Sequence, residues 1–172
     1  MKKYLLLVVC SLLLTSVGMT SETAPESVNV KSREKTMSAP SVSLGYVILY
    51  VKDVAAALTF YEQAFGLSRR FFNDDHGKAY GELETGAARL AFASFELVSA
   101  NLKHEFTAAS PDKAPPGFEI ALVTPEVPAL YARALKAGAT AVSEPATKPW
   151  GQTVAYVRDK DGHLVELCTP LP

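Results

Sequence analysis

The sequence predicts an α+β fold built from two βαβββ modules, with curved mixed sheets and the helices outside them. Two observations point to this fold. Short runs rich in β-branched and aromatic residues accompany two amphipathic segments, and the same order of runs occurs twice between residues 43 and 170. Gly66 and Gly138 end the two amphipathic segments at matching places, which indicates an internal duplication of the pattern.

The first module is expected to cover residues 43–95. It begins with a strand at 45–51, after which Asp53 is placed to cap a helix that ends at Phe65. Turn-forming residues divide the rest of the module into three further strands, which we expect at 67–72, 78–84 and 88–95.

The second module, residues 117–170, repeats this order. The expected elements are a strand at 118–123, a helix at 127–137, and strands at 139–144, 153–157 and 164–168. The polar segment 96–116, which ends in two prolines, is expected to be the linker between the modules. Together the modules and linker predict one domain over residues 43–170.

Residues 1–18 have the features of a secretory signal peptide. Two lysines precede an apolar run that is too short to span a bilayer, and small residues fit cleavage before Met19. We therefore expect export to the periplasm or out of the cell, with residues 19–42 as a disordered polar tether. A start at Met37 would instead give a cytoplasmic protein without a signal.

Composition excludes several classes of partner. The formal charge is −1, and it becomes −3 when two lysines leave with the signal peptide. No basic stripe indicates nucleic-acid binding, and no membrane association is expected after signal removal. Cys10 also leaves with the signal, so Cys168 can form no intramolecular disulfide and is expected to be a small buried side chain.

Alternation along the strands sorts their side chains into two faces. One face is uniformly apolar and bulky, as packing beneath a helix requires. The other mixes tyrosines, alanines, an arginine and glutamates, which is typical of a cavity lining. With one loop tryptophan as a further wall, the candidate ligand-binding residues are Tyr46, Tyr50, Arg89, Glu119, Trp150 and Glu166.

Glu119 and Glu166 are charged residues inside apolar strands, where burial without a partner would be costly. They could form an internal ion pair with Arg89, in which case no ligand is implied. They could instead form an anionic floor for a cationic or hydrogen-bonding ligand. A third arrangement has the two carboxyl groups sharing a proton, which would raise the pKa of one of them.

Several segments carry a family resemblance. They are Tyr46-Val-Ile-Leu-Tyr-Val-Lys-Asp-Val54, Phe60-Tyr61, Phe65-Gly-Leu67, Gly117-Phe-Glu-Ile-Ala-Leu122, Lys136-Ala-Gly-Ala139 and Asp159-Lys-Asp-Gly-His-Leu-Val-Glu-Leu167. In these segments the chain resembles the vicinal oxygen chelate superfamily, which groups glyoxalases, extradiol dioxygenases, fosfomycin-modifying enzymes and bleomycin-resistance proteins. The resemblance implies the glyoxalase-like fold over about residues 43–170.

The resemblance also implies where a metal would bind, because metal enzymes of this superfamily take His and Glu ligands from the first, fourth, fifth and eighth strands. These positions here hold Tyr46, Ala91, Glu119 and Glu166, and only Glu166 matches the glyoxalase pattern. Ala91 has no ligating atom, and a tyrosine keeps its proton to about pH 10. Neither a metal nor another cofactor is therefore expected.

These observations predict an exported protein that binds a small organic ligand, similar to the metal-free bleomycin-resistance branch, with no catalytic residue assigned. The alternative is a lyase, isomerase or dioxygenase of the same superfamily that uses Mn, Fe, Ni or Zn in an atypical site. A third hypothesis is a non-catalytic interaction module. The resemblance is also compatible with a homodimer whose cavities draw on both subunits.

Overall fold

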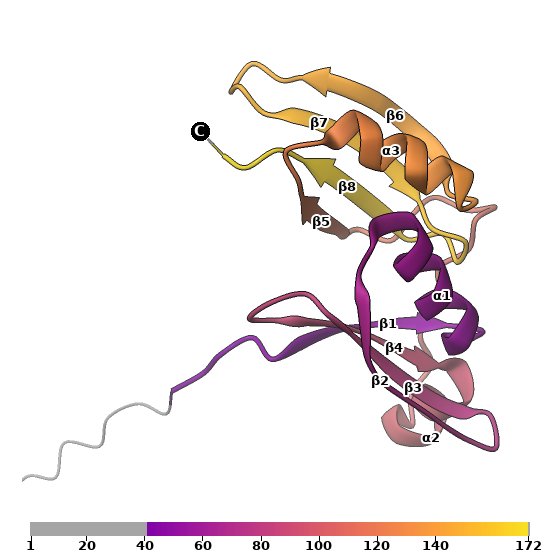
Figure 1. Ribbon diagram of the computed structural model, residues 1–172. Helices are drawn as coiled ribbons and strands as arrows, with labels where there is room; N and C mark the ends of the chain where they lie inside the picture. Colours follow the sequence, from indigo (N-terminus) through magenta and orange to yellow (C-terminus); the bar gives the residue numbers. More distant parts are fainter. Residues whose placement is uncertain (1–40, 172) are drawn as a thin grey trace, which may run out of the picture. The chain divides into compact units, whose positions relative to one another are not determined.

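The computed structural model describes residues 41–171 and shows two βαβββ modules, each with a four-stranded mixed sheet (Figure 1). The first module contains β1 (Tyr46–Val51), α1 (Val54–Phe65), β2 (Ser68–Asp75), β3 (Lys78–Glu84) and β4 (Arg89–Ser94). The second contains β5 (Glu119–Val123), α3 (Val127–Lys136), β6 (Thr140–Thr147), β7 (Thr153–Arg158) and β8 (Leu164–Cys168). The predicted fold class is confirmed.

The two sheets have the same topology. Their strand orders are β1-β4-β3-β2 in sheet 1 and β5-β8-β7-β6 in sheet 2. The pairs β1–β4 and β5–β8 are parallel, and the other pairs are antiparallel. The first strand of each module therefore lies at the edge of its sheet.

Local sequence signals explain where α1 begins and ends. The side chain of Asp53 accepts a hydrogen bond from the backbone N–H of Ala56 at 2.9 Å, as an N-cap residue does. Gly66 follows the helix in the left-handed region at φ 74°, which a residue with a Cβ adopts only with strain. Arg133 of α3 donates to the carbonyl oxygens of Gln63 at 2.6 Å and Glu62 at 3.1 Å, so it satisfies the last turn of α1 from the other module.

The hydrophobic core lies between the helices α1 and α3 and one face of each sheet, as alternation predicted. Leu58, Phe60 and Tyr61 of α1 are almost completely buried against Leu49, Phe92 and other strand residues. Burial of side chains of this size contributes roughly 1.5–3 kcal/mol each. We call the sheet face that packs on α1 and α3 the proximal face, and the opposite one the distal face.

A buried polar contact joins the modules within this core. The hydroxyl of Tyr61 donates to Asp159 at 3.0 Å, and Asp159 also contacts Nδ1 of His163 at 3.0 Å. Burial, followed by the charge of Asp159, raises the pKa of Tyr61 well above its usual value. The turn between β7 and β8 is therefore tied to α1 through a satisfied polar group.

The segment 96–116, expected to be the linker between the modules, contains a helix that was not predicted, α2 (Phe95–Leu102). Ser94 caps this helix by accepting from the N–H of Leu97 at 3.2 Å, and Glu96 lies in the first turn. The helix covers part of the distal face of sheet 1, on the opposite side from α1 (Figure 1). Val98 is the buried side chain of this helix, and most of its other residues are exposed.

Two strands run further than expected. β2 extends to Asp75 because a two-residue turn at His76 and Gly77, both with positive φ, connects it directly to β3. β6 extends to Thr147 through register shifts in its pairing with β7.

Within residues 41–171, no helix is both long enough and apolar enough to cross a bilayer. The expected signal peptide, and the expected tether as far as residue 40, lie outside the described residues.

Candidate functional site

The distal faces carry two separate polar clusters, one on each sheet. The distal face of sheet 2 brings together Glu119 of β5, Glu166 of β8 and Tyr156 of β7. The distal face of sheet 1 brings together Glu82, Tyr80, Arg70 and Arg89.

In sheet 2 the two glutamates predicted to share a face do lie next to each other. Glu119 is exposed, and a partial loss of solvent together with the neighbouring Glu166 raises the pKa of Glu119 above its usual value. The hydroxyl of Tyr156 donates to Glu166 at 2.9 Å; burial and this hydrogen bond raise the pKa of Tyr156 to about 12. The sharing of a proton between Glu119 and Glu166 stays a prediction.

Cys168 borders the same cluster and is buried, as predicted. Burial and a hydrogen bond with Glu166 raise the pKa of its thiol to about 11. A thiol with so high a pKa is a poor nucleophile at neutral pH, which agrees with a packing role.

In sheet 1 the central group is Glu82, which is only 9% exposed. It accepts hydrogen bonds from Arg70 at 2.7 Å and from the hydroxyl of Tyr80 at 3.0 Å, and Arg89 lies 3.7 Å away. Burial alone would raise the pKa of Glu82, but these hydrogen bonds and the two arginine charges lower it. Burial and the bond to Glu82 raise the pKa of Tyr80 to about 12.

The hypothesis of an ion pair between Arg89 and the two predicted glutamates is wrong. Among the described residues, Arg89 has Glu82 as its ion-pair partner. The reason is topological, because β4 lies beside β3 in sheet 1, whereas Glu119 and Glu166 belong to sheet 2.

Sequence reasoning missed Glu82, Tyr80, Arg70 and Tyr156. The same alternation that sorted the other strands was available for the first two, since residues 80 and 82 alternate with apolar or glycine positions on β3. Arg70 could not be placed this way, because an irregularity in β2 between Arg69 and Phe71 shifts the faces.

The aromatic candidates do not gather at one place. Tyr50 packs edge-on against Phe106 at 5.2 Å and lines a pocket beneath α2. Tyr46 is 52% exposed, near the start of β1. Trp150 is 58% exposed, and its indole N–H donates to the side chain of Gln152 at 2.8 Å.

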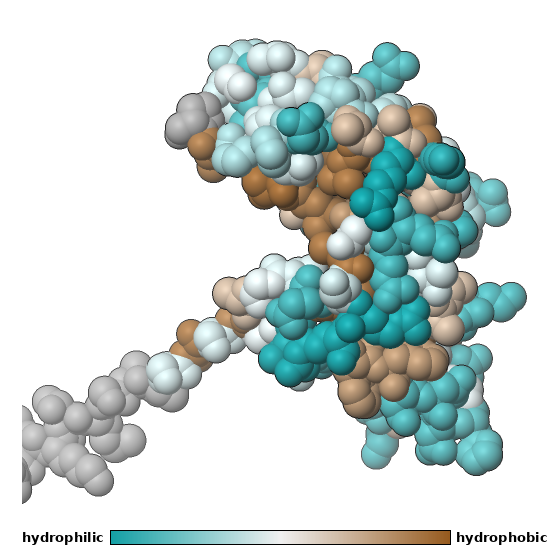
Figure 2. Space-filling model, in the orientation of Figure 1, coloured by the Kyte–Doolittle hydropathy of each residue, from teal (hydrophilic) through white to brown (hydrophobic). Residues whose placement is uncertain are grey.

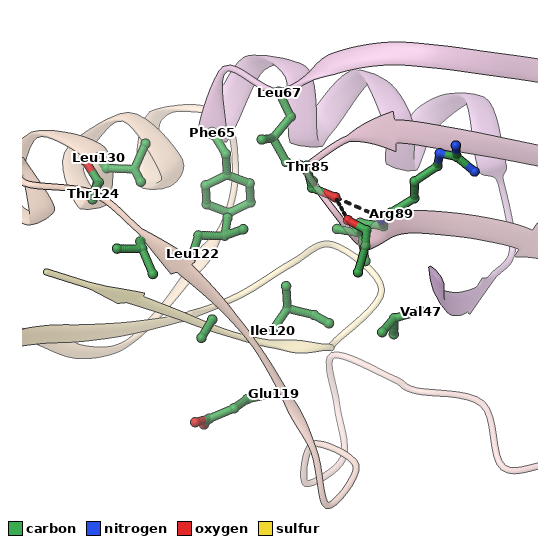
Figure 3. Close-up of a pocket in the computed structure, with 14 residues that line it drawn as sticks. Val47, Phe65, Leu67, Thr85, Arg89, Glu119, Ile120, Leu122, Thr124 and Leu130 are labelled. Carbon is green, nitrogen blue, oxygen red and sulfur yellow. Dashed lines mark hydrogen bonds between the residues drawn. The ribbon is translucent and has the colours of Figure 1, made fainter. Parts of the chain in front are cut away.

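Two cavities border these surfaces. The larger, about 660 Å³, has apolar walls that include Phe65, Leu67, Ile120 and Leu122, which point toward one another in Figure 3. Two charged residues, Arg89 and Glu119, also line this cavity (Figure 3). Figure 2 shows the corresponding apolar surface in the recess between the two sheets. The smaller cavity, about 300 Å³, is the pocket beneath α2.

The family's metal positions do not offer a suitable donor set in this chain. Ala91 presents a fully buried methyl group, and Tyr46 and Ala91 lie on sheet 1 whereas Glu119 and Glu166 lie on sheet 2. Within residues 41–171 no group of three or more His, Cys, Asp or Glu side chains is arranged to hold a metal ion. Zinc, nickel and iron sites normally use nitrogen or sulfur ligands, which these positions lack.

The histidines lie elsewhere. His163 is buried and bonded to Asp159, while His76 occupies the β2–β3 turn and His104 the segment after α2.

Comparison with known proteins supports the assignment of the fold. A glyoxalase-related enzyme from Fulvimarina pelagi superposes with a TM-score of 0.64 at 22% identity, over 74% of this chain and 88% of that one. The hypothetical protein SA1046 from S. aureus gives 0.61 at 21% identity, over 77% and 96%. A glyoxalase/bleomycin resistance protein/dioxygenase family enzyme from Burkholderia phytofirmans PsJN gives 0.58 at 21% identity, over 74% and 98%.

No curated protein matches the chain. A family model, however, matches residues 43–167, nearly the whole of the two modules. The chain therefore belongs to the glyoxalase/bleomycin resistance protein/dioxygenase superfamily.

Proposed function

We propose that this chain binds a small organic molecule on the distal faces of its sheets, without a metal. Proteins of the superfamily bind small molecules, and this chain has their fold. The observation that carries the metal-free part of the proposal is Ala91. A family ligand position is occupied by a methyl group, while the face around it keeps tyrosines, glutamates and arginines.

The hydrogen-bond pattern supports binding rather than acid–base chemistry in sheet 1. Glu82 is held by Arg70 and Tyr80, so its carboxylate is kept ionised and its oxygens are already used. A general base works best with a pKa near the working pH, whereas the pKa of Glu82 is lowered, so Glu82 is a weak base. Fixed polar groups beside an apolar pocket are what orient a bound small molecule.

One observation favours the alternative, a metal-dependent lyase, isomerase or dioxygenase. Glu119 and Glu166 occupy two family ligand positions and lie side by side, so together they offer several carboxylate oxygens. Such oxygens suit a hard cation such as Mn²⁺. The two hypotheses predict different effects of Glu166→Gln. If the chain binds a small molecule without a metal, the substitution lowers ligand affinity; if it is a metal-dependent enzyme, the substitution removes the bound metal.

Ligand-observed NMR with a panel of aromatic acids, amines and neutral amides tests the binding proposal. We expect at least one compound to bind in metal-free buffer, with protein resonances shifting on β1, β4 or β8. Tyr80→Phe and Glu166→Gln should weaken the binding on their respective sheets. Loss of all binding in the presence of a chelator, with turnover of a substrate when Mn²⁺ is restored, would contradict the proposal.

We also propose export and dimerisation. Export rests on the signal-like residues 1–18, and mass spectrometry of the protein purified from its native host tests it. A mature N-terminus at Met19 supports it, and an N-terminus at Met37 contradicts it. Dimerisation rests on the unpaired edge strands β1 and β5 and on exposed apolar residues beside them, Tyr46, Phe118 and Val123.

A further inference from the structure

We propose that the distal face of sheet 1 binds an organic anion, with a flat apolar body in the pocket beneath α2 and a carboxylate on Arg89. This inference rests on the proposed binding function and assigns the class of ligand. It follows from the shape of the pocket, the position of Arg89 on the same face of sheet 1, and the unused donors of that arginine.

The pocket lies over the middle of sheet 1 and is mostly apolar. Ala93 of β4 stands between Tyr50 of β1 and Tyr80 of β3 in the pairing register, so a small side chain lies between two rings. Helix α2 closes the pocket from outside. The lining consists of Ile48, Tyr50, Tyr80, Ala93, Leu97, Val98, Asn101 and Leu102, enclosing about 300 Å³. No charged side chain lines it.

Arg89 also lines the larger cavity, and it lies on the same face of β4 as Ala93 of this pocket. Glu82 stands directly opposite Ala91, and Nε of Arg89 lies 3.7 Å from Oε2 of Glu82. The arginine side chain therefore leans across Ala91, toward the carboxylate to which Tyr80 donates. Arg89, Ala91 and Ala93 occupy successive positions on this face of β4, about 6.6 Å apart. The guanidinium lies beside the Glu82 carboxylate, and Glu82 stands opposite Ala91, one such step from Ala93 in the pocket wall.

The donors of Arg89 are unused, in contrast to those of the other arginines in residues 41–171. Arg69 donates to Glu62, Arg70 to Glu82, Arg133 to the end of α1 and Arg158 to four carbonyl oxygens. The Arg89 side chain donates no hydrogen bond to any described residue, and it is 37% exposed. Glu82 does not use it at hydrogen-bond distance because Arg70 and Tyr80 already occupy both carboxylate oxygens.

A guanidinium with free terminal nitrogens matches a carboxylate, which it binds through two parallel hydrogen bonds. The adjoining pocket matches an aromatic ring, since Tyr50 and Tyr80 offer ring faces or edges on either side. Arg70 is already bonded to Glu82 and lies 3.5 Å from Glu84, so Arg89 is the charged group here with donors to spare, and a cation beside it would be disfavoured. The predicted class is therefore aromatic carboxylates.

Three naphthalene probes of matched shape test this class on the full chain by isothermal titration calorimetry: 2-naphthoate, 2-naphthamide and 2-naphthylmethylammonium. We expect naphthoate to bind roughly tenfold or more tighter than the amide, because a hydrogen bond to a charged group is worth more than a neutral one. The ammonium probe should bind weakest.

Arg89→Gln should bring naphthoate to the affinity of naphthamide and leave naphthamide unchanged. The matched control is Arg69→Gln, which removes an arginine of β2 that is bonded to Glu62 on the proximal side. Asn101→Trp, an exposed substitution on α2 at the pocket, should weaken both probes, whereas Ser99→Trp on the same helix but outside this pocket should not.

Equal affinity of naphthoate and naphthamide, or an unchanged preference in Arg89→Gln, would overturn this inference while leaving small-molecule binding intact. Failure of all three probes to bind would overturn it as well. The binding function itself fails only if the wider panel of compounds gives no ligand on either sheet, so the two failures are distinguishable.

Discussion

At the scale of single residues, the distal faces contain two carboxyl groups whose pKa values move in opposite directions. Arg70, Tyr80 and Arg89 keep the pKa of Glu82 low, whereas a partial loss of solvent and Glu166 raise that of Glu119. The two shifts have opposite consequences for the pH dependence of stability, because they change proton binding by the folded state in opposite senses.

Glu82→Gln should lower the free energy of unfolding by about 1 kcal/mol at neutral pH. The folded-state pKa of Glu82 is below its unfolded value, so its stabilisation is present above about pH 4.5 and is lost as pH falls through the folded value. Urea unfolding at pH 7 and at about pH 3.5 should therefore show a difference from the native protein that shrinks in acid. Glu84→Gln, at a more exposed carboxylate near Arg70, is the control and should cost less. A difference that grows in acid would contradict the assignment.

Glu119→Gln should change stability in the opposite direction to Glu82→Gln and slightly stabilise the protein at neutral pH. The pKa of Glu119 is raised in the folded state, so the favourable protonated arrangement is present below the unfolded pKa and is lost as pH rises through the folded pKa. The amide of a glutamine at position 119 stays uncharged at every pH, so this stability is not lost as pH rises, and its N–H can still donate a hydrogen bond to Glu166. At a pH above the folded-state pKa of Glu119, the Glu119→Gln variant should have a higher unfolding temperature than the native protein. In acid, where Glu119 is protonated in both states, the two unfolding temperatures should be equal. Glu144→Gln on β6 controls for the change in net charge, and an equal effect there would contradict the pairing.

At the scale of elements, α1 lies so close to sheet 1 that only glycine fits beneath it at one position. A Cβ on Gly81 would lie 2.6 Å from Cδ1 of Leu58 and 3.2 Å from Cγ1 of Val54, both on α1. This contact fixes the distance between the helix and β3, and hence the positions of Tyr80 and Glu82 on the other face of that strand.

Gly81→Ala should destabilise the protein by about 1–3 kcal/mol, since a methyl group overpacks this contact. Gly45→Ala is the matched control, because a Cβ at that position meets nothing within 4 Å. Chemical denaturation of both variants gives the comparison. Equal stability of the two variants would contradict the close approach of α1 to β3.

Helices and strands were predicted correctly where a single sequence pattern applied, and incorrectly where two patterns favoured different structures. Alternation correctly placed Leu49, Phe92 and Leu167 in the core, and the capping residue Asp53 located the start of α1. The helix α2 was missed because residues 96–116 were assigned together as a polar linker, although Ser94 is a residue type that caps helices. The extra length of β2 was missed because Asn73, Asp74 and Asp75 have turn chemistry, yet they pair with β3 up to a tighter turn.

At the scale of the whole molecule, the sequence identified three charged residues of the distal faces, Arg89, Glu119 and Glu166, but missed Glu82 and Arg70 and did not predict how these charges are grouped. Glu119 and Glu166 meet as predicted, since both belong to parallel neighbours β5 and β8. Arg89 joins Glu82 instead of them, because grouping depends on which sheet each strand enters, and a periodic pattern does not contain that information.

The edge strands lead to a prediction about assembly. Val123→Lys should convert the proposed dimer to a monomer, because Val123 is 64% exposed on the edge strand β5 and a lysine there opposes strand pairing. Val142→Lys on β6 replaces another exposed valine and should leave the assembly unchanged. Size-exclusion chromatography with light scattering gives the masses. A monomeric native protein, or the same effect in both variants, would contradict dimerisation through this edge.

The metal content of the purified protein tests the metal-free proposal most directly. The protein is offered Mn²⁺, Fe²⁺, Ni²⁺ and Zn²⁺ separately, passed through a desalting column and measured by elemental analysis, alongside Glu166→Gln and Glu119→Gln. We expect far less than one metal ion per chain, with no difference between the native protein and the two variants, because Ala91 has no ligating atom and the other three positions offer no nitrogen or sulfur ligand. About one bound ion per chain that is lost in Glu166→Gln would contradict the proposal and favour the metal-dependent enzyme.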